Sequence, residues 1–290
     1  MAAEPLPALW LVDKPAGPTS HDVVAGVRRR LGRRTKVGHA GTLDPFATGL
    51  LVVLSGRATR LATYLSGLDK RYLATIRTGS TSATGDPEGP ISAAGAPATA
   101  GAIAAVLEFF RGEQEQRVPA FAAVKVGGER LYAKARRGES VEAPVRRITI
   151  HSLELVTDLG DGRAVLDVHC SKGTYIRQLV MDIGERLGCG AYCEELRRTH
   201  VGTLSVADAV APDEVTAGGG REAAEALVHL PRVSVDAREA LDLTHGRAVA
   251  GPGSGLTALC LDGRLVAVGE ADGSGTIRPR VVVRTPEDLA

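Results

Sequence analysis

One carboxylate lies in a segment whose composition can hold it in a fixed position. Asp44 precedes Pro45 and follows His39, in a stretch with glycines at positions 38, 41 and 49. Glycine permits backbone angles that other residues avoid, and proline restricts the residue before it to extended or turn conformations. The apolar residues 50–54 follow. Such a loop can present Asp44 as a nucleophile or base before an apolar wall, although an Asp that only caps a turn fits the same spacing.

Other common reaction centres find little support in the sequence. Cys189 and Cys193 are spaced like half of a zinc site, but no second Cys or His pair follows at a usable spacing. The glycines at 38 and 41 are not followed by the Gly-Lys-Ser/Thr of a phosphate-binding loop. We therefore expect no metal site and no phosphate-binding loop of this type.

Positive charge is concentrated in the first part of the chain. The net charge is only +1, yet residues 1–72 carry 11 Lys or Arg against 5 Asp or Glu, whereas residues 201–290 carry 8 against 13. Residues 28–36 are basic at six of nine positions, and residues 118–138 mix basic residues with Phe121 and Tyr132. This pattern favours contact with RNA phosphates and bases, although solvated helix faces or an exposed excursion fit the charge alone.

The periodicity predicts a mixed α and β chain. We expect strands over residues 9–12, 49–54, 71–78, 148–155 and 164–170, and helices over 21–31, 58–65, 100–110 and 173–187, the last entered by a turn. Residues 81–99 are rich in Gly, Pro, Ser and Thr and predict a mobile surface loop. Residues 211–220 predict a linker, and short strands with Gly turns after Pro231 predict a small β-rich domain.

Composition indicates a soluble chain of the reducing cytoplasm. Hydrophobic residues make up 44% of the 290 residues, enough for a large core. No apolar run approaches the roughly 20 residues of a membrane-spanning helix. The four cysteines are spread along the chain, unlike a disulfide framework. We expect a cytoplasmic protein with no membrane partner.

Residues 38–51, GHAGTLDPFATGLL, resemble the catalytic motif of the TruB family of pseudouridine synthases. Further resemblances follow in the family's order, at residues 11–20 (LVDKPAGPTS), 69–72 (DKRY), 170–177 (CSKGTYIR), 188–191 (GCGA) and 196–199 (LRRT). Residues 269–270 and 278–283 resemble the end of the family's small PUA domain. The resemblance covers nearly the whole chain.

The resemblance implies an α+β fold. It implies a catalytic domain with a mixed, largely antiparallel sheet over residues 1–230, an RNA-contacting hairpin near 118–138, and a PUA-like RNA-binding domain over 232–290. It also implies a cofactor-free isomerase that converts uridine 55 of the tRNA T-loop to pseudouridine. The implied partner is the T-arm stem-loop of tRNA, bound by a monomer without a guide RNA.

The resemblance also assigns roles to residues. It makes Asp44 the catalytic residue, with Tyr72 stacked on the target uracil and Arg177 paired with Asp44. A nearby guanidinium favours the ionised form of a carboxylate and orients it. The remaining implied contacts are pocket walls at Tyr175 and Leu196, a position on the RNA side for His39, and RNA contacts at Arg30, Arg33, Arg34, Lys125, Arg136 and Arg137.

The sequence departs from the family pattern at three places. Phe121-Ala122 stands where the family usually has Tyr-Ser, Ala83 replaces a common acidic residue, and Arg60 replaces a common Lys. These changes concern RNA contacts rather than the reacting carboxylate. Two alternatives remain open: a tRNA-binding or tRNA-folding protein with little catalytic role, and a guide-dependent synthase of the same superfamily.

Overall fold

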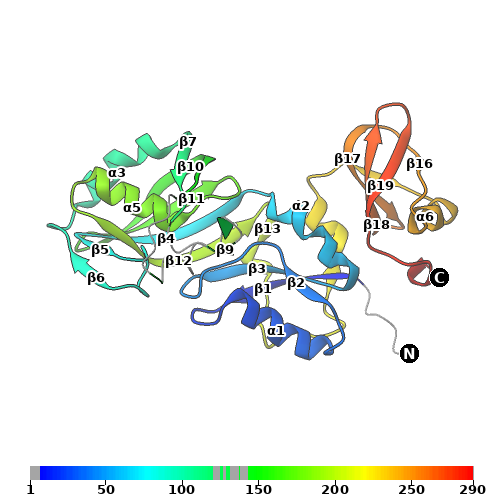
Figure 1. Cartoon of the computed structure of the whole chain (residues 1–290), viewed down its shortest axis with the longest axis horizontal. Coiled ribbons are helices and arrows are strands. Elements are labelled where there is room, and N and C mark those ends of the chain that lie inside the picture. The colour runs from blue at the N-terminus through cyan, green and yellow to red at the C-terminus, as the bar shows by residue number, and fades with distance from the viewer. Residues whose placement is uncertain (1–6, 120–124, 127–128, 131–136, 138–142, 290) are drawn as a thin grey trace. The chain divides into compact units, whose positions relative to one another are not determined.

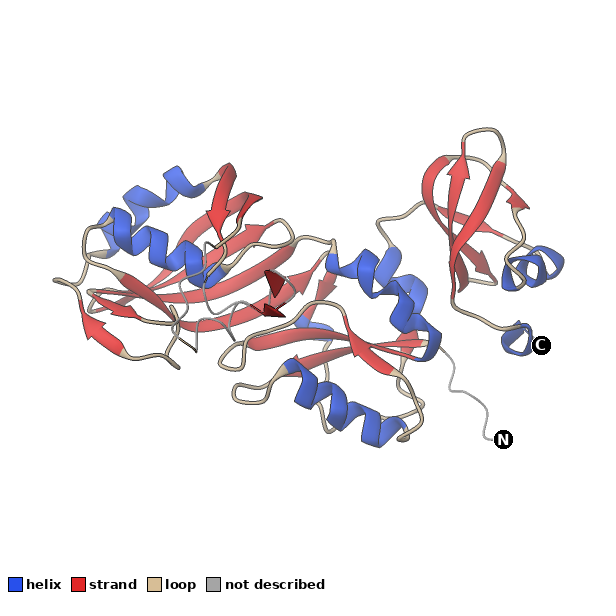
Figure 2. Cartoon of the chain, in the orientation of Figure 1, coloured by secondary structure: helices blue, strands red, loops and turns tan. Residues whose placement is uncertain are grey.

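The computed structural model describes residues 7–119, 125–126, 129–130, 137 and 143–289 (Figure 1). The chain forms two compact units. The first comprises Met1–Pro45, Gly49–Leu68 and Val201–Ala290, and the second comprises Phe46–Thr48 and Asp69–His200. Figure 2 shows that both units combine helices with β-strands. The mixed, largely antiparallel α+β fold expected from the sequence is confirmed.

The first unit begins with a small sheet that carries the N-terminal motifs. Its strands are β1 (Ala8–Lys14), β2 (Val37–His39), β3 (Thr48–Ser55) and β14 (Arg221–Glu222), in the order β14-β1-β3, with β2 also paired to β3. Strands β1 and β3 are antiparallel, and Lys14 lies opposite Gly49. Both faces of β1 are buried: Leu9 and Leu11 join one apolar cluster, whereas Trp10 and Val12 join another.

Helix α1 (Ser20–Leu31) covers one face of this sheet. Thr19 and Asp22 form a capping box at its start, which satisfies backbone N–H groups that have no partner inside the helix. Val23, Val24 and Val27 pack with β1 and β3 residues in one cluster. The helix therefore begins where the sequence predicted, and its last turn carries Arg28, Arg29 and Arg30.

Short helical segments complete the first part of this unit. They are η1 (Gly56–Leu61), α2 (Ala62–Ser66), η3 (Val206–Asp208) and η4 (Ala223–Leu227), with the short strand β13 (Leu204–Ser205) before η3. Residues 58–65 are thus helical as expected, although the first turn is a 3-10 helix.

The C-terminal part of the first unit is a separate five-stranded sheet. Its strands are β15 (Arg232–Ser234), β16 (Val249–Ala250), β17 (Ser254–Leu261), β18 (Arg264–Asp272) and β19 (Thr276–Val282), in the order β15-β17-β18-β19-β16. The expected β-rich region is confirmed, but helix α6 (Ala237–Thr244) was not predicted. Asp236 and Glu239 form its capping box, a signal that the search for Gly-spaced strands passed over. The segment η5 (Pro286–Leu289) follows β19.

The second unit contains a five-stranded array in the order β12-β4-β11-β10-β7. Its strands are β4 (Lys70–Thr78), β7 (Gly112–Arg117), β10 (Val145–Gly160), β11 (Arg163–Cys170) and β12 (Ala191–Val201). The pairs β4–β11, β10–β11 and β7–β10 are antiparallel. Helices α3 (Ala100–Leu107), followed by η2 (Glu108–Phe110), and α5 (Ile176–Arg186) contact each other and strands of this array (Figure 1).

Two smaller elements belong to the second unit. Residues 81–99, expected to be a loop, contain most of an antiparallel pair, β5 (Ser80–Ser82) with β6 (Ile91–Ala93). The prediction was wrong there because short strands joined by a Gly-rich turn have a loop-like composition. In the segment expected to contact RNA, β8 (Lys125–Val126) pairs with β9 (Glu129–Arg130) as a short hairpin.

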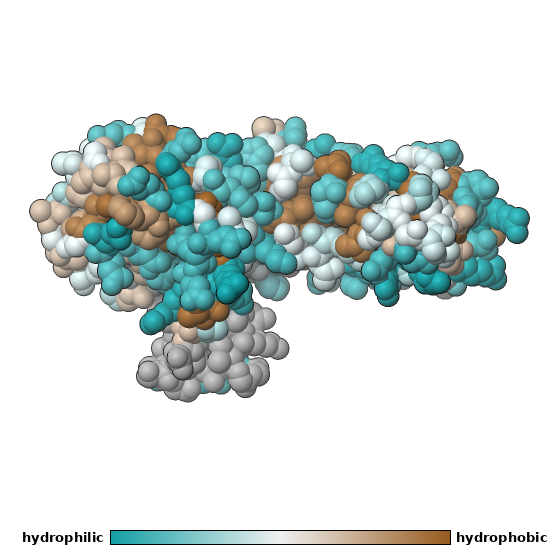
Figure 3. All heavy atoms as spheres, turned by 90° about the horizontal axis from the view of Figure 1, so that it is seen from above, coloured by the Kyte–Doolittle hydropathy of each residue, from teal (hydrophilic) through white to brown (hydrophobic). Residues whose placement is uncertain are grey.

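The surface mixes hydrophilic and hydrophobic residues. On the face shown in Figure 3, brown hydrophobic patches are interrupted by teal hydrophilic residues. Exposed apolar side chains include Phe109, 58% exposed, and Ile91, 49% exposed. Within the described part of the chain, no helix has the length and apolar character to cross a bilayer.

Candidate active site

The loop that carries Asp44 is tied to the start of helix α1. The Ser20 hydroxyl accepts a hydrogen bond from Leu43 N at 2.9 Å and donates one to Leu43 O at 3.0 Å. Ser20 is 1% exposed, so neither backbone group of Leu43 has to compete with bulk water for this partner. The residue before Asp44 is therefore held through both of its backbone polar groups.

The residue after Asp44 is held from the end of strand β1. Pro45 O accepts hydrogen bonds from Lys14 Nζ at 3.0 Å and from Gly17 N at 2.9 Å. Lys14 Nζ also donates to Pro15 O at 2.9 Å, and the Lys14 side chain is fully buried. Gly17 has φ of +103°, which glycine adopts without strain. Asp44, itself half-buried, thus projects from a backbone fixed on both sides.

His39 belongs to the same unit as Asp44. It ends strand β2 and lies opposite Val53 of β3. Its ring meets the ring of His21 edge-on, with centroids 5.5 Å apart. The imidazole is therefore positioned by the sheet and by the first turn of α1.

Arg177 is buried in the second unit with an acidic partner. Its Nη1 donates to Asp86 Oδ2 at 3.0 Å and to Thr84 O at 2.7 Å, and the two side chains are 4% and 5% exposed. Asp86 Oδ1 accepts Glu88 N at 3.0 Å. A guanidinium bound by several acceptors has a defined direction, because its planar donors fit only one arrangement. The β5–β6 turn therefore orients Arg177.

The same turn requires glycine at one position. Gly85 has φ of +75°, and a Cβ there would lie 2.9 Å from Met181 Sδ of helix α5. Gly85 O accepts Cys193 N at 3.0 Å. The turn thus packs closely on α5, the helix that carries Arg177.

Tyr175 is fixed through its backbone by a side chain from strand β7. Gln116 Oε1 accepts Tyr175 N at 2.8 Å, and Gln116 Nε2 donates to Tyr175 O at 3.0 Å. Gln116 is 4% exposed. Tyr175 precedes α5 in an extended conformation. The two hydrogen bonds from Gln116 fix its backbone, and therefore the point from which its side chain extends.

Tyr72 and Leu196 are buried apolar residues on two strands of the second unit. Tyr72 lies on β4 opposite Val168 and is 8% exposed. Leu196 lies on β12, is 6% exposed, and its carbonyl accepts Thr48 Oγ1 at 3.4 Å. An aromatic ring and an aliphatic chain of this kind can bind the two faces of a flat base.

Two buried titratable groups, Lys70 and Cys170, lie opposite each other at the start of β4. Lys70 is 7% exposed, and burial, reinforced by the charge of Arg198, lowers its pKa to about 8. Its strand partner is Cys170, and burial raises the pKa of that thiol to about 12. Because the thiolate is the nucleophilic form of cysteine, Cys170 is poorly suited to attack a substrate.

The basic residues expected to contact RNA fall in two places. Arg30, Arg33 and Arg34 are exposed at the end of α1 and after it. Arg137 forms an ion pair with Glu129 at 2.7 Å, with both side chains about half exposed. Lys125 is in β8, and Arg136 lies outside the described residues.

The family comparison agrees with this arrangement of motifs. Residues 28–176 match the family described as "TruB family pseudouridylate synthase (N terminal domain)", and residues 177–230 match the "tRNA pseudouridylate synthase B C-terminal domain". The chain belongs to the TruB family of pseudouridylate synthases.

Relatives in this family align over most of the chain. A protein of Aromatoleum aromaticum named "tRNA pseudouridine synthase B" is 43% identical over 285 residues, which cover 95% of this chain and 92% of the relative. A protein of the same name from Synechococcus sp. is 43% identical over 290 residues, covering 94% and 96%. The family resemblance inferred from the motifs is confirmed.

Solved structures share the fold of this chain. The chain is similar to a chain of the "Crystal Structure of a Cbf5-Nop10-Gar1 Complex", with a TM-score of 0.75 and 27% identity over 97% of this chain and 86% of the other. A second match, at TM-score 0.74 and 25% identity over 98% and 88%, is the "Structure of H/ACA RNP bound to a substrate RNA containing 2'-deoxyuridine".

The TruB motifs predicted six candidate site residues, but not the residues that hold them in place. Asp44 and His39 lie in the first unit, and Tyr72, Tyr175, Arg177 and Leu196 lie in the second. Gln116 and Asp86 were not singled out. Asp86 lies between Gly85 and Gly89 in a segment of loop-like composition, and nothing in the sequence shows that its side chain is buried.

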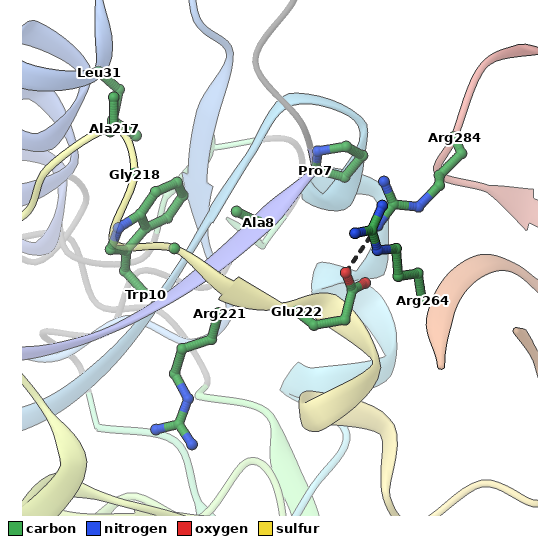
Figure 4. Close-up of a pocket in the computed structure, with 11 residues that line it drawn as sticks. Pro7, Ala8, Trp10, Leu31, Ala217, Gly218, Arg221, Glu222, Arg264 and Arg284 are labelled. Atoms are coloured by element: carbon green, nitrogen blue, oxygen red, sulfur yellow. Dashed lines mark hydrogen bonds and ion pairs between the residues drawn. The ribbon is translucent and has the colours of Figure 1, made fainter. Parts of the chain in front are cut away.

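The first unit also contains a cavity away from the Asp44 loop. It has a volume of about 380 Å³ and lies among β1, β14 and the C-terminal sheet (Figure 4). At one end Arg284 donates to Glu222 Oε2 at 2.8 Å, and Trp10 lies at the other end. Arg284 Nε also donates to Leu265 O at 3.1 Å. These contacts link the C-terminal sheet to β14, and none of the predicted pocket residues lines this cavity.

Proposed function

We propose that this protein is a tRNA pseudouridine synthase that isomerises uridine 55 of the T-loop, with Asp44 as its nucleophile or base. The observation that carries the proposal is the anchoring of the Asp44 loop through both neighbouring residues. Relatives named "tRNA pseudouridine synthase B" at 43% identity support tRNA as the substrate. The division into a catalytic domain over 1–230 and a PUA-like RNA-binding domain over 232–290 is part of this proposal.

The reaction requires positioning more than oxidation or group donation. The N1–C1′ bond of uridine breaks, the uracil rotates, a C5–C1′ bond forms, and the C5 proton leaves while N1 gains one. Reactant and product are isomers, so the overall reaction consumes no second substrate. The detached base must be kept in place, and near-attack geometry can supply much of the rate enhancement.

The proposed pocket assigns one task to each side chain. The ring of Tyr72 stacks on the uracil, and Leu196 and Tyr175 form the walls that retain the base. Arg177 pairs with Asp44 and keeps the carboxylate ionised, because an adjacent cation favours the charged form. The rigid Asp86 contact supports this task by fixing the guanidinium. His39 acts on the RNA side, next to the loop that presents Asp44.

RNA recognition is proposed for the basic surface near these motifs. Flipping the target uridine costs a few kcal/mol, and phosphate contacts can offset that cost. The proposed contacts are Arg30, Arg33, Arg34, Lys125, Arg136 and Arg137. The enzyme acts as a cytoplasmic monomer on the T-arm stem-loop without a guide RNA. The identity of 43% to a relative named "tRNA pseudouridine synthase B" supports tRNA as the partner.

The test is release of tritium from an unmodified tRNA transcript that contains [5-³H]uridine. The wild type should release the label, and Asp44→Asn should retain less than about 1% of the rate, a barrier increase of roughly 3 kcal/mol or more. Binding of tRNA by Asp44→Asn should persist, because removing a negative charge does not weaken attraction to phosphate. Mapping the product should place pseudouridine at position 55.

A protein that only binds or folds tRNA gives a different result. It would bind the transcript, and the label would stay in place for the wild type as well as the variant. A variant that turns over at a rate near that of the wild type would instead exclude Asp44 as the reacting group.

A further inference from the structure

Three potential metal ligands converge in the second unit, and none of them is a group assigned to the reaction. Asp69 precedes β4, His151 lies on β10 and His169 lies on β11. Each contributes one ligand atom, and these atoms all lie within 4.8 Å of one another. The three residues come from neighbouring positions in the strand order β4-β11-β10. The fold therefore brings together residues that are 82 and 18 positions apart in the chain.

The strand register explains why both histidines lie on the same face. In β11, Val168 and Cys170 are buried, so His169 between them points to the opposite face. In β10 the register shifts between Ile150 and Ser152, which makes His151 the extra residue of a β-bulge. A bulge changes the direction of a side chain relative to regular alternation. It places His151 beside His169, with ring centroids 4.8 Å apart and planes at 46°.

The carboxylate completes the group. His151 Nε2 lies 3.1 Å from Asp69 Oδ2, and these two side chains are 36% and 46% exposed. On a tetrahedral ion with metal–ligand bonds of about 2.0–2.2 Å, ligand atoms lie about 3.4 Å apart. The Asp69–His151 pair already meets this spacing. The ligand atoms of the other pairs lie at most 4.8 Å apart, so they need to approach each other by about 1.4 Å or less. Rotation of exposed side chains can provide such a shift.

The arginine in register with His169 is engaged in an ion pair. Arg71, the register partner of His169, donates to Asp167 through Nε and Nη2 at 2.8 Å each, so its charge is compensated. Two neutral imidazoles and one carboxylate would leave one net positive charge on a bound divalent ion and open coordination positions for water or an oxyanion.

We propose that Asp69, His151 and His169 form a binding site for a divalent transition metal of the zinc type. Two imidazole nitrogens select Zn²⁺, Co²⁺ or Ni²⁺ over Mg²⁺ and Ca²⁺, which prefer oxygen ligands. The ion links β4, β10 and β11 and is separate from the isomerisation, which proceeds through Asp44 without it. The site is thus a structural addition to the fold, with three protein ligands that solvent can reach.

The experiment is calorimetric titration of the metal-free, full-length protein with ZnCl₂ and, in parallel, MgCl₂. The wild type should bind one Zn²⁺ and no Mg²⁺, and Zn²⁺ should raise the melting temperature because it binds only the folded state. His151→Gln, His169→Gln and Asp69→Asn should each weaken binding about tenfold or more and abolish the rise in melting temperature. The matched control His245→Gln, in the C-terminal part, should bind as the wild type does.

A second measurement keeps the proposal testable if a variant folds poorly. X-ray absorption of the wild type loaded with one equivalent of Zn²⁺ should show nitrogen and oxygen neighbours with two imidazoles. Sulfur neighbours would assign the ion to cysteines and overturn the proposal. Absence of binding by the wild type, or unchanged binding by a folded His169→Gln, would overturn it as well.

Discussion

At the scale of single residues, the site depends on polar groups that are buried together with their partners. Arg177, Gln116 and Ser20 each bind specific acceptors or donors in regions with little solvent. Removing one member of such a pair costs more than the pair itself contributes, because the other member remains buried without its partner. These contacts are therefore sensitive to small substitutions.

The Arg177–Asp86 ion pair gives a direct prediction. Asp86→Asn removes the negative charge that a buried guanidinium contacts, so unfolding should require less free energy, by up to about 3–5 kcal/mol. The matched control is Asp167→Asn, which breaks the Arg71 pair, where the Arg71 side chain is 50% exposed. That change should cost about 1 kcal/mol or less. Urea unfolding of both variants tests the contrast, and equal losses would contradict it.

Lys70 predicts a pH dependence of stability. Burial lowers its pKa in the folded protein to about 8, from the ordinary value of 10.5. Between these pH values the unfolded chain holds a proton that the folded chain has lost, so the contribution of Lys70 to stability rises with pH from about 8 to 10.5. The full rise should approach about 3 kcal/mol.

The measurement compares wild type with Lys70→Met across pH 8–10.5 by urea unfolding. The difference in unfolding free energy, wild type minus variant, should increase with pH, since all other groups titrate in both proteins. If the unfolding free energies of the two proteins changed in parallel with pH, Lys70 would keep an ordinary pKa in the folded state.

At the scale of elements, the sequence predicted those with regular patterns and missed those that carry buried charge. Helix α1 was found because valines at positions 23, 24 and 27 follow a capping signal. Strand β12, next to β4 in the sheet, was missed because Glu194, Glu195 and Arg198 interrupt any apolar alternation. Arg198 is nevertheless 1% exposed. Such a residue is buried only through tertiary contacts, which periodicity cannot reveal.

The candidate site shows the same limit. The glycines and Pro45 predicted a rigid loop around Asp44, and family motifs pointed to Tyr72, Tyr175 and Arg177. The supports lie far away in sequence: Ser20 holds Leu43 across 23 residues, and Asp86 holds Arg177 across 91. No local pattern links residues at such distances, so the structure was needed to find them.

The link between α1 and the Asp44 loop gives a prediction at this scale. Ser20→Ala removes both hydrogen bonds to Leu43 and leaves its N–H and C=O buried, which should cost about 1–3 kcal/mol of stability. The turnover number should fall by about a hundredfold, because a small displacement of a reacting group has an effect of that size. Binding of tRNA should change little.

The rate of tritium release measures the turnover number of Ser20→Ala, and filter binding measures its affinity for tRNA. The control is Ser66→Ala, an exposed serine whose hydroxyl donates to Thr63 O at 3.0 Å in helix α2. It should stay within about 0.5 kcal/mol of the wild type and keep full turnover. A Ser20→Ala variant with unchanged turnover would show that the loop does not need this anchor.

At the scale of the molecule, the C-terminal sheet is joined to the rest of the first unit through apolar packing. Ala258, Leu265 and Val283 share one buried cluster with Leu9 of β1 and Leu227 of η4. Arg60 Nη1 also donates to Val282 O at 2.9 Å. Deleting residues from 232 onward would expose this cluster, so RNA binding by the C-terminal part is better examined with surface substitutions than with a truncation.

Charge distribution predicts which part of the molecule binds the RNA. Residues 1–72 carry an excess of basic residues, 11 against 5 acidic, whereas residues 201–290 carry 8 basic and 13 acidic residues. A protein that releases counterions from phosphates loses affinity as salt rises, with a slope set by the number of contacts. The double variant Arg33→Ala/Arg34→Ala should therefore bind an isolated T-arm stem-loop more weakly and reduce the salt slope by about 1 for each lost contact. The control Arg238→Ala, on exposed helix α6, should leave the slope unchanged. Because the proposed contacts all come from residues 30–137 and none from the acidic C-terminal part, the stem-loop should also be modified nearly as fast as whole tRNA. Tritium release from both substrates and filter binding between 50 and 200 mM salt provide the measurements. Recognition would instead be assigned to the C-terminal part if the enzyme failed to modify the isolated stem-loop. The same would follow if only Arg238→Ala changed the salt dependence of binding.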